Sequence, residues 1–66
     1  MSREREQLIQ VERRIASARE RIAWHRKNIE GLTREGRRTD LAVAMLDGWE
    51  RILRVFEQQR ERIRQD

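Results

Sequence analysis

A heptad pattern of apolar residues runs through the first half of the chain and constrains its fold more than any other feature. Steps that alternate between three and four residues visit Leu8, Val11, Ile15, Ala18, Ile22, His25, Ile29 and Leu32. The histidine is the one polar member of this series. Residues that recur every 3.5 positions stay in line along one side of a helix, where a second helix can pack against them. The pattern predicts a helix over about residues 3–34.

A short break follows at residues 35–39. Gly36 suits the left-handed conformation just beyond a helix end, and Thr39 suits the residue that caps the start of the next helix. Asp40 then falls in a first helical turn, where the positive end of the helix dipole favours an acidic side chain. Because a connection of about five residues makes two helices antiparallel neighbours, the chain is expected to turn back on itself here.

A second heptad pattern predicts a helix over about residues 40–64. Its members are Ala42, Met45, Trp49, Ile52, Phe56, Gln59 and Ile63, with Leu41, Leu46 and Leu53 beside them. The turn sets an antiparallel register that places His25 opposite Trp49. In the same register, Met45 and Ile52 are expected to face the first helix. The apolar stripe is wider than one seam between two helices can cover.

We therefore expect a single all-α domain, an antiparallel two-helix hairpin that dimerises into a four-helix bundle. A chain of 66 residues is near the size at which one core is marginal, and pairing two hairpins would cover the wide stripe. The monomer would then be weakly folded or unfolded. The residues expected to form the core and the dimer seam are Leu8, Val11, Ile15, Ile22, His25, Ile29, Leu32, Met45, Leu46, Trp49, Ile52, Leu53 and Phe56.

The composition excludes several classes of protein. The chain has no cysteine, which excludes disulfides and thiolate metal sites and fits a reducing compartment. Its longest apolar run, residues 41–46, is far shorter than the roughly 20 residues of a membrane span. Residues 1–6 lack the apolar core of a signal peptide. We expect a cytoplasmic protein of bacterial type that does not enter a membrane.

His25 is the single histidine of the chain. Its imidazole is expected to set the register by a hydrogen bond across the bundle, with metal binding or a proton switch as the alternatives. The neighbouring positions on the same side of the helix carry no second ligand type, so no metal site is expected. No serine or threonine is placed to use this histidine as a general base. We expect no catalytic residues, no enzyme activity and no cofactor.

Two features are candidates for a binding surface. Trp24 lies off the heptad series and could anchor a protein partner, stack on a nucleic-acid base, or cover the hairpin edge. A basic surface near the turn is formed by Arg21, Arg26, Lys27, Arg34, Arg37 and Arg38. Residues 21–38 contain these six basic and two acidic residues, so 6 − 2 gives +4, which equals the formal net charge of the whole chain. This charge could bind phosphate or keep a loop soluble.

The middle two-thirds of the chain resembles a group of small, basic, helical-hairpin proteins of alphaproteobacterial type, whose function is unassigned. The residues that carry the resemblance are Ile29-Glu30-Gly31-Leu32, Gly36, Thr39, Ala42, Leu46, Glu50, Leu53 and Arg60. The group's pattern has an acidic residue before the threonine, and this chain has Arg38 there. The resemblance implies architecture and no chemistry. In architecture alone the chain also resembles the Rop-type hairpin dimer, and a shared fold does not transfer a function.

From these features we expect a non-enzymatic protein-interaction or regulatory module that acts as a homodimer. The alternative is an RNA- or DNA-binding hairpin that uses the basic residues near the turn. A third possibility, an amphipathic helix pair on an anionic membrane surface, is disfavoured because glutamates are mixed evenly among the arginines.

Overall fold

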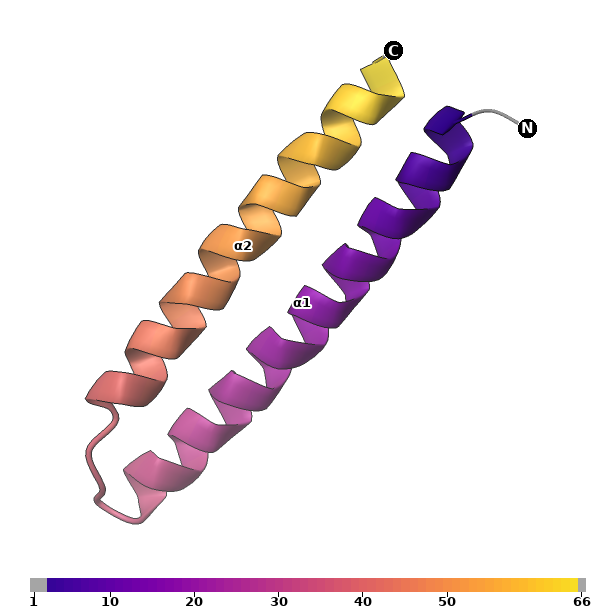
Figure 1. Cartoon of the computed structure of the whole chain (residues 1–66). Helices are drawn as coiled ribbons and strands as arrows, with labels where there is room; N and C mark the ends of the chain where they lie inside the picture. The colour runs from indigo at the N-terminus through magenta and orange to yellow at the C-terminus, as the bar shows by residue number, and fades with distance from the viewer. Residues whose placement is uncertain (1–2, 66) are drawn as a thin grey trace.

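The computed structural model describes residues 3–65 as two long helices packed side by side (Figure 1). Helix α1 spans Arg3–Arg34 and helix α2 spans Asp40–Gln65. The helices run antiparallel, with the turn at one end of a thin molecule that measures 53 × 15 × 12 Å. The predicted all-helical hairpin is confirmed. Helix α2 ends one residue later than the sequence pattern suggested.

Gly36 lies in the turn and adopts the left-handed conformation that the sequence predicts for it. Gly36 has a φ of 69° in the left-handed region, and its N–H donates to the carbonyl of Thr33 at 3.1 Å. The N–H of Arg37 donates to the carbonyl of Leu32 at 2.9 Å. These two bonds form a Schellman motif, which satisfies the last carbonyls of α1. Thr39 directly precedes α2, and its carbonyl accepts the N–H of Val43 at 2.8 Å.

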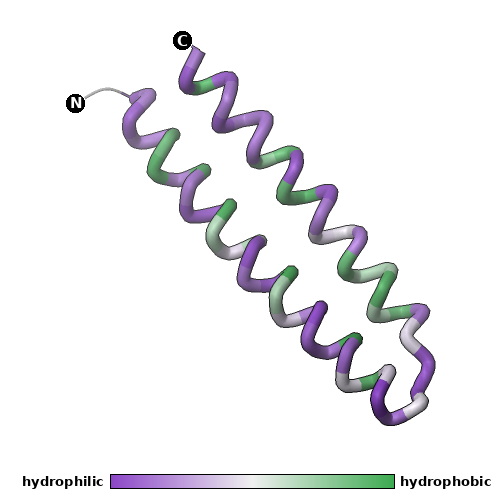
Figure 2. The backbone as a smooth tube through the Cα atoms, turned by 180° about the vertical axis from the view of Figure 1, so that it is seen from behind, coloured by the Kyte–Doolittle hydropathy of each residue, from purple (hydrophilic) through white to green (hydrophobic). Residues whose placement is uncertain are grey.

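The core is a single line of side chains between the two helices. Its buried members are Val11, Ile15, Ala18, Ile22 and His25 on α1, and Ala42 on α2. Apolar segments recur along both helices between polar stretches, as the green and purple bands of Figure 2 show. Leu8, Ile29 and Leu32, the remaining members of the α1 series, are half-buried. The whole α1 series therefore lies on the side that α2 covers.

Helix α2 is rotated relative to the seam expected from the sequence. Met45 and Ile52 were expected to face α1, but both are exposed, while their neighbours Leu46 and Leu53 are half-buried. Adjacent residues on a helix point roughly 100° apart. The side of α2 that contacts α1 therefore differs from the expected side by a partial rotation about the helix axis. The rotation brings two glutamates of α2 within ion-pair distance of α1. The half-buried apolar residues of α2 are Leu46, Trp49, Leu53, Phe56 and Ile63.

Candidate interaction surface

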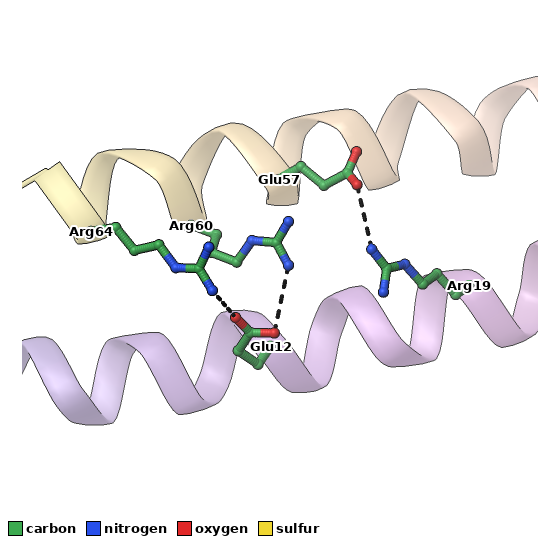
Figure 3. Close-up of polar contacts among 5 residues, drawn as sticks. All are labelled: Glu12, Arg19, Glu57, Arg60 and Arg64. Carbon is green, nitrogen blue, oxygen red and sulfur yellow. Dashed lines mark hydrogen bonds and ion pairs between the residues drawn. The ribbon is translucent and has the colours of Figure 1, made fainter.

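One broad face of the hairpin carries the ion pairs that join the two helices, and we call it the ion-pair face (Figure 3). The pairs are Arg19–Glu57 at 3.6 Å, Arg26–Glu50 at 3.5 Å, Arg60–Glu12 at 3.6 Å and Arg64–Glu12 at 3.4 Å. Figure 3 shows Glu12 of α1 reached by two arginines of α2. Exposed pairs of this kind stabilise a fold by only about 0–1 kcal/mol each. They therefore contribute little to stability, but they mark the side on which the two helices present charged residues to each other.

The opposite broad face exposes several large apolar side chains, and we call it the open face. It is formed by Trp24 on α1 and by Leu41, Met45, Ile52 and Val55 on α2, whose exposed fractions are 61%, 75%, 47%, 39% and 50%. The sequence marks Trp24 as a surface candidate, and the structure places it here beside α2 residues. A cluster of large exposed apolar side chains on one face is typical of an interaction site.

The apolar residues of the open face on α2 follow their own heptad pattern. Leu41, Met45, Gly48, Ile52 and Val55 are separated by steps of four, three, four and three residues. We call these five residues the outer stripe. Reasoning from the sequence recognised that α2 has more apolar surface than one seam needs, but it missed Val55 and Gly48. The signal that could have revealed them is a second heptad series, in which each member comes one residue before a member of the series Ala42, Leu46 and Trp49.

Grooves run between the helices on the open face, and two of them are lined by Trp24. The larger, of about 700 Å³, is lined by Ser17, Glu20, Arg21, Trp24, His25, Met45 and Trp49. The smaller, of about 290 Å³, lies nearer the turn and is lined by Trp24, His25, Asn28, Leu32, Arg38, Leu41, Ala42 and Met45. Trp24, His25 and Met45 line both grooves. The two tryptophans therefore lie on the same side of the hairpin.

His25 lies beneath this face. It is 4% exposed, and its ring packs edge-on against Trp24 with ring centroids 5.1 Å apart. It lines the larger groove together with Trp49, the residue that the sequence places opposite it. The Nδ1 atom is buried and has no hydrogen-bond partner. Among residues 3–65, no three histidine or carboxylate side chains cluster as metal ligands would.

The six basic residues near the turn do not share one surface. Arg21 borders the larger groove on the open face, whereas Arg26 lies on the ion-pair face beside Glu50. The other four basic residues are Lys27 and Arg34 at exposed positions on α1, and Arg37 and Arg38, which pair with Glu35 at 3.6 Å and with Asp40 at 2.9 Å. The positive charge is therefore divided between faces and partly neutralised.

Comparison with known proteins identifies no relative of this chain. No family model, curated protein or solved structure matches the chain. The resemblance to alphaproteobacterial hairpin proteins therefore stays a hypothesis. Neither helix, within the part of the chain that the structure describes, is long and apolar enough to cross a membrane.

Proposed function

We propose that this chain is a non-enzymatic interaction module that acts as a homodimer. In this dimer the open faces of two hairpins cover each other and form a four-helix bundle in the cytoplasm, a reducing compartment that suits a chain without cysteine. The observation that carries the proposal is the outer stripe, because its four large side chains are 39–75% exposed in a single hairpin.

The size of the core supports the same proposal. Within the described residues, the hairpin buries five apolar side chains and His25, and two of the five are alanines. A core this thin is marginal for an independent domain. Full burial of a Leu, Met, Ile or Val side chain stabilises by about 1.5–3 kcal/mol. Covering the partly exposed outer stripe on both copies would therefore add substantially to the stability of the fold.

The experiment that tests this proposal is molar mass by light scattering across a dilution series, with helicity measured on the same samples. We expect a mass near twice 8.1 kDa that falls on dilution together with helicity, since folding and association would be coupled. A well-folded species of 8.1 kDa at all concentrations would contradict the proposal.

Nucleic-acid binding is the second candidate, and one observation favours it. Arg21 and Trp24 line the same groove, so a cation and an exposed aromatic ring lie together as they do in single-strand binding proteins. The division of the other basic residues between faces weighs against it. Binding to generic RNA or duplex DNA should fall steeply with salt if phosphates are contacted. An absence of binding at low salt would exclude this candidate.

A further inference from the structure

We infer that two copies pair through α2, antiparallel to each other, with the two Gly48 residues facing across the two-fold axis. This inference rests on the proposed dimer and specifies its geometry. The evidence comes from the spacing of the outer stripe, the open space at Gly48 and the distribution of charge along the hairpin.

The spacing of the outer stripe is nearly symmetric about Gly48. Leu41 lies seven residues before it and Val55 lies seven residues after it. Met45 lies three residues before it and Ile52 four residues after it. If a second α2 runs in the opposite direction with Gly48 against Gly48, each of these side chains meets an apolar side chain of the partner. A self-complementary patch of this kind is what a two-fold dimer requires.

Nothing within a single hairpin explains why residue 48 is a glycine. It lies in the interior of α2, where glycine is unfavourable for a helix, and its φ is not in the left-handed region. A Cβ placed on it would meet no atom within 4 Å. A glycine at the centre of an exposed apolar stripe lets a second helix approach closely at that point. The partner's α2 accounts for both the glycine and the open space.

The charge near the turn favours the antiparallel orientation over the parallel one. Residues 34–38 contain three arginines and one glutamate, so 3 − 1 leaves +2 on each copy. A parallel dimer would bring these two like charges together. In an antiparallel dimer with Gly48 against Gly48, the two copies of position 38 are about 30 Å apart, 20 residues at roughly 1.5 Å each. This separation is several times the roughly 8 Å over which charges interact at physiological salt.

Cysteine crosslinking tests this geometry without interference, because the chain has no cysteine of its own. The variants Leu41→Cys and Val55→Cys are mixed in a thiol redox buffer, and intact mass identifies each disulfide-linked product. Antiparallel pairing places position 41 of one copy beside position 55 of the other. The two copies of position 41 are then about 21 Å apart, 14 residues at 1.5 Å each, beyond the reach of a disulfide.

We expect the mixed product to dominate and Gly48→Cys to crosslink to itself. Gly31→Cys is the matched control, because Gly31 is also a helical glycine with open space but lies on α1. Products that join like positions, 41 to 41 and 55 to 55, would overturn the antiparallel orientation. A dimeric mass with no crosslink above the Gly31→Cys control would overturn pairing through α2 and leave the proposed dimer standing. A monomeric mass for the unmodified chain would overturn both.

Discussion

Arg21 of α1 places its guanidinium over the indole ring of Trp49 on α2, 5.7 Å from the ring centroid. The guanidinium is attracted to the electron-rich face of the ring, and the aliphatic part of the side chain can cover apolar surface. This contact joins the helices on the open face, where Arg21, Trp24 and Trp49 line one groove. Arg21 is therefore a packing residue as well as a source of charge.

We expect Arg21→Ala to lower the free energy of unfolding by about 0.5–1 kcal/mol, the usual size of an exposed cation–π contact. Urea unfolding followed by circular dichroism measures this change. Arg13→Ala is the control, since Arg13 is an exposed arginine on the same helix and Ala has the same effect on helix propensity at both sites. Equal effects at both positions would show that the contact with Trp49 contributes nothing.

We expect His25→Leu to raise the free energy of unfolding by about 1 kcal/mol. A buried polar atom without a partner costs stability, and leucine removes the Nδ1 atom while filling similar space. Thermal and urea unfolding check this expectation, with Ile22→Leu as a control for repacking at a neighbouring buried position. A loss of stability in His25→Leu would instead mean that the imidazole gains a hydrogen-bond partner in the assembled protein.

If the proposed dimer forms, we expect Ile52→Glu to shift the protein toward monomer, because a charge on the outer stripe would have to be buried in that dimer without a partner. Val43→Glu is a matched control. Val43 is 40% exposed and Ile52 39% exposed, but Val43 lies off the outer stripe. Sedimentation or light scattering at equal concentrations separates the two variants. If both variants remain dimeric, the outer stripe is not the dimer interface.

Much of the fold follows from the sequence, and particular residues show where sequence reasoning stops. Every member of the α1 series except His25 is apolar, so its heptad pattern identifies the buried side. Gly36 occupies the left-handed position that few other residues tolerate. Along α2, Met45 precedes Leu46 and Ile52 precedes Leu53. Either member of each pair could continue the series, so the pattern alone cannot fix the rotation of α2.

The rotation of α2 decides which of its residues lie on the open face. The sequence therefore predicted Trp24 as a surface residue but did not predict which residues of α2 lie beside it. Trp24 could be singled out because it interrupts a charged surface. Gly48 and Val55 follow the spacing of the outer stripe in the sequence, but it is the rotation of α2, which brings two of its glutamates to α1, that places this stripe on the open face. The contact between Arg21 and Trp49 depends in addition on the register of the helices and on side-chain conformations, neither of which hydrophobic periodicity specifies.

The two helical glycines, Gly31 and Gly48, provide a test that separates helix stability from helix association. A Cβ added at either position would meet no atom within 4 Å, so alanine fits at both positions in a single hairpin. Gly31→Ala should therefore raise the free energy of unfolding by about 0.5–1 kcal/mol, because alanine has the higher helix propensity.

Gly48→Ala should behave differently if α2 meets a second α2 at this point. The added methyl group would hold the two helices apart, and we expect the dimer dissociation constant to rise about tenfold, equivalent to about 1.4 kcal/mol. Helicity at concentrations where the protein is monomeric should rise in both variants, since both gain helix propensity. Dilution series for Gly31→Ala and Gly48→Ala measure both quantities on the same samples. Identical dissociation constants for the two variants would show that Gly48 does not lie at a close helix crossing.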